Sequence, residues 1–371
     1  MNRPQRSEQD QGNGGRHHGG VMRNILRLSA VMKKLGGKTA EEKYAEASEC
    51  WNTDPERVAD AAEKYFMPPK EILHTLQPCK KANPISLVLS GIAAGDIAGE
   101  PYEGGFAGDH YPDKDYREIP FFIKHSCFTD DTVMSFACQR AACANRKYHN
   151  DGKAAVLMYE ANLRKFARRF LNAGYGANFY AWAVLGENNN EYRSYGNGGA
   201  MRSGVIGAVF ADDDIRTVIR QAVYSALPSH SHPEGIKGAV VTAVSVYLAL
   251  HEVPKEYIDQ YMSFFYTEPF RDIWSPMPYM SIGELIGHGW QCASVTTQIT
   301  MPEVIINLRD SDSYESCIRN VFRYPCDSDT IGAISGGIAA ALYGNVSAEG
   351  IDIRKELRER LQELEDFGGR L

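Results

Sequence analysis

The sequence predicts an all-α protein. Its long apolar runs cover residues 132–144, 154–170, 215–227, 235–250, 281–295 and 330–342. These runs exceed the usual strand length of about 5–6 residues. No alternation of apolar and polar residues persists between turn signals, so a sheet is not indicated. Because the runs are rich in Ala and Gly, we expect a compact body of closely packed helices.

The first eighty residues differ from this body in charge. Residues 1–82 hold 14 Lys/Arg and 11 Asp/Glu (+3), which leaves 26 and 36 (−10) of the totals of 40 and 47 for residues 83–371. Residues 1–20 have almost nothing to bury and are expected to be disordered. Helical spacing follows at 21–35, and two further helices are expected at 39–50 and 55–66. We therefore divide the chain into a tail (1–20), a helical extension (21–82) and a body (83–371).

The composition disfavours several classes of protein. A net charge of −7 argues against a broadly basic nucleic-acid binder. The N-terminus has no apolar segment behind its arginines, so a secretory signal is not indicated. The longest apolar stretches, 238–250 and 331–344, are shorter than the roughly 20 residues of a membrane span. The eight cysteines form no CxxC pair, and free thiols in a cytoplasmic protein are the simplest interpretation.

Two acidic clusters each stand directly before an apolar helix: Thr129-Asp130-Asp131-Thr132 and Asp327-Ser328-Asp329-Thr330. Taken alone, each is a helix cap whose carboxylates are favoured by the helix dipole. If the two clusters converge, their charges repel, and a bound cation removes that repulsion. Oxygen-only donors favour Mg²⁺, Mn²⁺ or Ca²⁺ over zinc. The pair therefore indicates a two-metal site that orients a substrate and activates water.

A third segment, residues 91–103, carries glycines at four-residue spacing and two acids. The glycines let another helix pack closely. For Asp96, the alternative to a functional role is a polar residue on that helix that is satisfied locally. Glu103 follows Pro101 in a loop, and beside a metal site it is a candidate for proton transfer.

Two further segments are candidates for substrate contact. Residues 195–202 form a glycine-rich loop that could cradle an anion, with Arg202 adding charge or making a structural pair; a plain turn is the alternative. His230 and His232 have a spacing that zinc could use, but no third ligand is evident. For these histidines, loop residues with satisfied hydrogen bonds and substrate contact remain open alternatives.

Taken in order, the motifs GDxxGxxxE, TDDT, GNGGAMR, SHxHP and DSDT resemble those of the ADP-ribosylglycohydrolase family over residues 85–345. The resemblance implies an all-α fold with two Mg²⁺ or Mn²⁺ ions. The metal ligands that it implies are Thr129, Asp130, Asp131, Asp327, Asp329 and Thr330. It also implies catalytic roles for Glu103, Asp130 and Asp131, and substrate contacts at Gly198, Gly199, Met201 and His230. The departures, Val205 in place of a frequent proline and Ala340-Ala341 in place of Gly-Ala, touch none of these residues.

The resemblance implies hydrolysis of the glycosidic bond between ADP-ribose and a modified protein side chain, with ADP-ribosylarginine preferred. ADP-ribosylserine and O-acetyl-ADP-ribose are alternative substrates. Some family members protect cells against ADP-ribosyltransferase toxins, and residues 1–82 are a candidate segment for binding such a toxin. A second hypothesis is therefore an immunity protein that inserts this extension into a transferase, with hydrolysis secondary. The alternative for the extension is a helical cap with a disordered tail.

Overall fold

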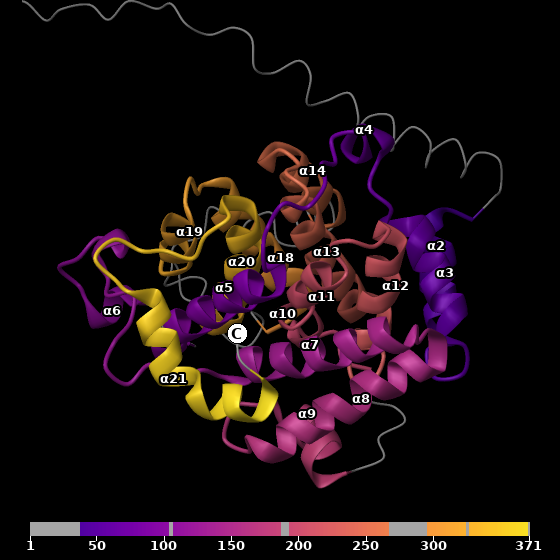
Figure 1. Ribbon diagram of the computed structural model, residues 1–371, viewed down its shortest axis with the longest axis horizontal. Helices are drawn as coiled ribbons and strands as arrows, with labels where there is room; N and C mark the ends of the chain where they lie inside the picture. Colours follow the sequence, from indigo (N-terminus) through magenta and orange to yellow (C-terminus); the bar gives the residue numbers. More distant parts are fainter. Residues whose placement is uncertain (1–37, 104–106, 187–192, 267–294, 324–325, 370–371) are drawn as a thin grey trace, which may run out of the picture. The chain divides into compact units, whose positions relative to one another are not determined.

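The computed structural model describes residues 38–103, 107–186, 193–266, 295–323 and 326–369 (Figure 1). The chain divides into two units, Met1–Lys43 and Tyr44–Leu371, and the second holds every described helix from residue 55 onward. The described residues of this second unit contain helices and no strand, with only isolated bridges at Gly196–Thr296 and Ala348–Ile351. The all-α prediction is confirmed. The predicted helix at 21–35 and nearly all of the one at 281–295 lie outside the described residues.

The helices carry the labels of Figure 1. In chain order they are α2 (Ala40–Ser48), α3 (Pro55–Phe66), α4 (Lys70–Leu73), α5 (Pro84–Gly99), η1 (Glu100–Tyr102), α6 (Ala107–His110), η2 (Tyr116–Glu118), α7 (Asp130–Tyr148), α8 (Gly152–Arg169), α9 (Ala177–Tyr180), η3 (Ala181–Leu185), α10 (Gly198–Met201), α11 (Gly204–Val209), α12 (Ile215–Ala226), α13 (Pro233–Leu250), α14 (Lys255–Tyr266), α18 (Thr297–Arg309), α19 (Tyr314–Val321), α20 (Ser328–Tyr343) and α21 (Ile353–Gly368).

Local signals set several helix starts. The side chain of Asp54 accepts a hydrogen bond from the backbone N–H of Arg57 at 3.1 Å, and Pro55 begins α3 at the predicted residue. Helix α5 starts in the same way, with Asn83 as the cap and Pro84 as the first residue. Because Pro lacks a backbone N–H, it fits the first helical turn, where that donor has no partner. Short capping sequences therefore locate both helices.

Helices α5 and α20 lie against each other at unusually short range (Figure 1). A Cβ atom on Gly95 would overlap the carbonyl oxygen of Gly332. Near the end of α5, the Ser328 hydroxyl donates to the carbonyl of Gly99 at 2.8 Å. This contact holds the C-terminal end of α5 beside the N-terminal end of α20, where the predicted metal ligands lie.

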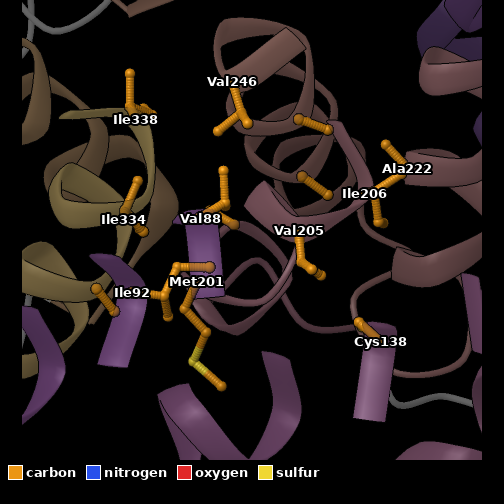
Figure 2. Packing of buried hydrophobic residues seen from close by; sticks show 14 of the residues in the cluster. Val88, Ile92, Cys138, Met201, Val205, Ile206, Ala222, Val246, Ile334 and Ile338 are labelled. Atoms are coloured by element: carbon orange, nitrogen blue, oxygen red, sulfur yellow. The ribbon is translucent and has the colours of Figure 1, made fainter. Parts of the chain in front are cut away.

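The hydrophobic core extends from this helix pair into the neighbouring helices. Figure 2 shows Ile92 of α5, Ile334 of α20 and Val246 of α13 in one buried cluster. Met201 lies in the same cluster and is 5% exposed. Helix α13 alone, among the described residues, has the length and composition of a membrane span, and 89% of it is buried inside the protein.

Residues 44–82 pack on the helical body. Arg220 of α12 lies 2.7 Å from both Asp60 and Glu63 of α3, and Glu56 binds the same guanidinium. Val58 and Phe66 of α3 are completely buried. This part of the extension therefore forms a helical cap that belongs to the same core as residues 83–369.

Candidate metal centre and glycine loop

The first predicted acidic cluster begins α7, and Asp96 of α5 holds it in place. Thr129 caps the helix, and its backbone N–H donates to Asp96 at 2.9 Å. The Thr132 backbone N–H donates to the same carboxylate at 3.2 Å, and both threonine hydroxyls also bind it. The alternative that Asp96 is satisfied locally is wrong, because its partners come from the start of α7. Asp96 thus holds the first turn of α7 in place, and with it the side chains of Asp130 and Asp131.

The second cluster begins α20 and meets the first directly. The Thr330 hydroxyl lies 3.1 Å from Oδ2 of Asp131, and the Thr129 hydroxyl lies at the same distance from that oxygen. Asp329 accepts from the backbone N–H of Thr330 at 2.8 Å. Although residues 131 and 330 are far apart in sequence, the close approach of α5 and α20 brings the two helix starts together.

The carboxylates form two overlapping groups. One ligand oxygen each from Asp96, Asp131 and Asp329 lies within 4.8 Å of the others, and the same holds for Glu103, Asp327 and Asp329. Asp329 belongs to both groups. The surface of Glu103 is largely exposed, but its carboxylate reaches this cluster. The structure therefore brings the predicted acids together, with Asp130 half-buried at their edge.

Burial and mutual repulsion disfavour the ionised forms of these acids. Burial raises the pKa of Asp96 to about 7. Burial, then Asp96 and Asp327, raise the pKa of Asp130 to about 8. Burial and neighbouring carboxylates also hold the pKa values of Asp131 and Asp329 well above the usual range. A nearby positive charge would reverse these shifts.

The centre fits a hard divalent cation. Oδ1 of Asp131 is buried and has no hydrogen-bond partner in the described part of the chain. Such an atom is costly unless something binds it. The donors are carboxylate and hydroxyl oxygens, which suit Mg²⁺, Mn²⁺ or Ca²⁺. A resident cation would therefore explain both the unpartnered oxygen of Asp131 and the crowding of the carboxylates around it.

The glycine loop borders this centre through Asn197, which belongs to the GNGGAMR motif but was not among the predicted site residues. Its side-chain amide donates to Oδ2 of Asp327 at 2.6 Å. Gly199 is buried, and a Cβ there would lie 2.8 Å from the carbonyl oxygen of Gly235. Gly198 is partly exposed. Gly199 and the buried Met201 thus shape the loop from inside, and substrate contact at the loop stays a prediction.

The two candidate histidines have different surroundings. His232 caps α13, where Nδ1 accepts from the backbone N–H of Glu234 at 3.1 Å. His230 is buried, and its ring lies against Gly198. No histidine joins a group of potential metal ligands among the residues that the structure describes. Of the two histidines, His230 therefore remains the candidate for substrate contact, and His232 is a helix-capping residue.

The loop before α9 lies over the start of α7 and supplies a residue that the sequence motifs did not reveal. The backbone N–H of Asp130 donates to the carbonyl of Ala173 at 2.6 Å. Two residues further on, the buried hydroxyl of Tyr175 has no partner in the described structure. Burial and then Asp130 raise the pKa of Tyr175. In the sequence, the flanking Gly174 and Gly176 predict no more than a turn at this position.

Helix α18 contributes a further acid to the neighbourhood of Asp327. Burial, and then the charge of Asp327, raise the pKa of Glu303 to about 8. Nothing in the sequence distinguishes Glu303 from an ordinary helical glutamate that follows Pro302.

An all-α body with paired carboxylate groups beside a glycine loop defines a helical protein with an acidic centre that could hold metal ions. The ADP-ribosylglycohydrolase family model matches residues 85–371, and the chain belongs to this family. The match begins at the start of α5, after the helical cap.

The assignment to this family is supported by curated relatives that share a low sequence identity with the chain. The chain is similar to "ADP-ribosylhydrolase ARH3" of Xenopus tropicalis, with 25% identity over 353 residues that cover 74% of this chain and 94% of the relative. The protein of the same name from Bos taurus is 26% identical over 269 residues, covering 59% and 71%. A solved structure described as "ADP-ribosylglycohydrolase-related protein complex" has a TM-score of 0.52 at 20% identity. It covers 78% of this chain and 98% of its own, which supports the fold.

Proposed function

We propose that the protein is a divalent-cation-dependent hydrolase that removes ADP-ribose from modified protein side chains. The observation that carries the proposal is the position of Asp329 in both carboxylate groups, next to a glycine loop that is tied to Asp327. This arrangement places a candidate cation site and a candidate phosphate site side by side. A cation-dependent hydrolase of ADP-ribosyl groups would use both.

Asp131, Asp327 and Asp329 would hold the cations, with Asp96 added from its place in the carboxylate group. Thr129, Asp130 and Thr330 stay the further ligands that the resemblance implies. Mg²⁺ or Mn²⁺ are the candidates, and two ions are the expected number. Bound cations supply positive charge that polarises the sugar and favours ionised carboxylates. Asp130 and Glu103 lie at the accessible edge of the centre. One of them takes a proton from the water that attacks C1″ of the ribose. The bond from C1″ to the acceptor atom breaks, and its electron pair stays on that atom, which takes up a proton.

Arginine-linked ADP-ribose is the first candidate substrate, on the resemblance of the motif spacing. Serine-linked ADP-ribose and O-acetyl-ADP-ribose are the alternatives. The deciding test is a mass-spectrometric assay with arginine-linked and serine-linked peptides side by side, in Mg²⁺ and in Mn²⁺. Release from the arginine-linked peptide alone supports the first candidate, and release from the serine-linked peptide alone refutes it. Release from neither peptide, together with an inert O-acetyl-ADP-ribose, refutes the proposed function.

A second candidate function is binding of an ADP-ribosyltransferase toxin through the N-terminal extension of a cytoplasmic protein. The supporting observation is the charge of residues 1–38, which hold 8 Lys/Arg and 2 Asp/Glu (+6). The test compares the full chain with a chain that starts at Tyr44, because a start near Ile85 would remove α3 from the core. Loss of transferase capture in the shorter chain, with hydrolysis retained, supports this role. Equal capture by both chains contradicts it.

A further inference from the structure

Arg202 is completely buried behind the glycine loop, directly after α10. One terminal guanidinium nitrogen donates to the carbonyl of Ser225 at 3.0 Å and to Oγ of Ser229 at 2.9 Å. The other lies 3.5 Å from Nδ1 of His230. A side chain in this position cannot present its charge at the surface of the loop. Its route to a ligand is therefore through His230.

These contacts determine which ring nitrogen of His230 carries the proton. Oγ of Ser229 lies 2.8 Å from Nδ1. Because guanidinium groups only donate, Nδ1 must accept when it faces Arg202. The Ser229 hydroxyl accepts from Arg202 and can donate its own hydrogen to Nδ1. In the opposite tautomer, a hydrogen on Nδ1 would point toward Ser229 but would also face the guanidinium. The network therefore favours a bare Nδ1 and a proton on Nε2.

The other edge of the ring lies under the loop. A Cβ atom on Gly198 would lie 2.7 Å from Nε2 and 2.9 Å from Cε1 of His230, so only glycine leaves room for the imidazole here. Nε2 has no hydrogen-bond partner among the described residues, although Nδ1 has two. The donor edge of His230 is thus available at the partly exposed Gly198.

We propose that Arg202 is a positioning residue that holds His230 as a neutral imidazole protonated on Nε2, so that His230 donates a hydrogen bond to a ligand oxygen at the glycine loop. The protonation state agrees with the surroundings, because burial and then the charge of Arg202 hold the pKa of His230 well below its usual value. Only the identity of the ligand, ADP-ribose, rests on the proposed function. The state of the ring can be measured without any ligand.

The first experiment is long-range ¹H–¹⁵N NMR of the ligand-free full chain labelled at histidine, between pH 5.5 and 8. The His230 signals are assigned by their absence in His230→Gln. We expect a bare Nδ1 and a protonated Nε2 across this range. A protonated Nδ1, or titration near the ordinary value of about 6.5, would overturn the proposal.

Two variants separate Arg202 from Ser229. Arg202→Met removes the guanidinium with a side chain of similar length. Burial still keeps the ring of His230 neutral in this variant, but the ring should then mix its two tautomers. Ser229→Ala leaves Arg202 facing Nδ1, so the Nε2-protonated form should persist. The reverse pattern contradicts the assignment to Arg202. If Arg202→Met does not fold, the spectra of the wild type and of Ser229→Ala still decide.

The second experiment measures ADP-ribose affinity by calorimetry. In His230→Gln the amide nitrogen can take the place of Nε2, whereas in His230→Asn it can only take the place of Nδ1. We expect the Asn variant to lose about tenfold in affinity, as for one hydrogen bond to a charged or polar ligand, and the Gln variant to lose less. His232→Asn, which preserves a helix cap, is the matched control and should bind as the wild type does. Equal binding by both His230 variants and the wild type would refute donation from Nε2.

Discussion

In the absence of divalent cations, the free energy of unfolding of the protein should fall as the pH rises from 5 to 8. Asp96 has an ordinary pKa near 3.8, and burial raises it to about 7 in the folded protein. A raised carboxyl pKa means that the folded state binds the proton more tightly than the unfolded chain does. The stability that this proton provides is present at pH 5 and is lost as the pH passes through 7.

The expected loss follows from that shift. Between pH 5 and 8 the folded protein keeps this proton over about 2 pH units in which the unfolded chain has already released it. At about 1.4 kcal/mol per unit, Asp96 alone lowers the free energy of unfolding by about 3 kcal/mol. Asp130, whose pKa is raised to about 8, acts in the same direction. For a chain of this size the loss corresponds to a Tm lower by roughly 4 °C.

The assay is thermal unfolding in a chelator at pH 5, 6, 7 and 8, repeated with Mg²⁺ or Mn²⁺. The cations should restore stability at pH 8 and have little effect at pH 5, because a cation competes with protons for the same oxygens. The Asp96→Asn variant, which cannot titrate, should show a shallower decline. A cation-free protein whose Tm rises toward pH 8, or one on which cations have no effect there, would refute the reasoning.

Substitutions at three positions test the packing around the centre. Gly95→Ala forces a methyl group against the backbone of Gly332 and should cost about 3 kcal/mol in urea unfolding; a loss below about 0.5 kcal/mol would contradict the close approach of α5 and α20. Asp96→Ala leaves the buried donors of α7 without an acceptor and should cost about 3 kcal/mol or more, whereas Asp96→Asn keeps an acceptor and should cost less; equal losses would speak against this hydrogen-bonding role. Tyr175→Phe removes a buried hydroxyl that has no described partner, so the free energy of unfolding should stay level or rise by up to about 1 kcal/mol. A clear fall in the stability of Tyr175→Phe would show that the hydroxyl has a structural partner.

The elements that could be predicted from sequence are those with local signals. Helix α3 begins where Asp54 and Pro55 indicate, and α7 and α20 begin at the acidic clusters. Helix α18 had no comparable signal, since Pro302 lies inside it and interrupts the helical pattern. Local propensity thus located helix starts well and missed a helix whose proline is accommodated by its surroundings.

The assembly of the site depended on contacts that no local pattern contains. The meeting of Asp131 with Thr330 follows from the glycine contacts between α5 and α20. The residues alone predicted a metal site only on the condition that the two clusters converge, and the family resemblance supported that convergence. The contacts of Asp96 could not be predicted from local sequence, because its partners on α7 lie 33 and 36 residues away. The role of Asn197 was hidden for the same reason, because Asp327 lies 130 residues further along the chain.

Cation-dependent hydrolysis at the carboxylate centre is tested most directly by release of ADP-ribose from ADP-ribosylated arginine by the full chain, with chelator and with added Mg²⁺ or Mn²⁺. Release should depend on the added cation and should be lost when both Asp130 and Asp131 are replaced by Ala. Serine-linked ADP-ribose and O-acetyl-ADP-ribose are run beside it, so that a different acceptor is not mistaken for inactivity. Undiminished release by the doubly substituted protein, or in the chelator, would contradict the central role of the carboxylate centre.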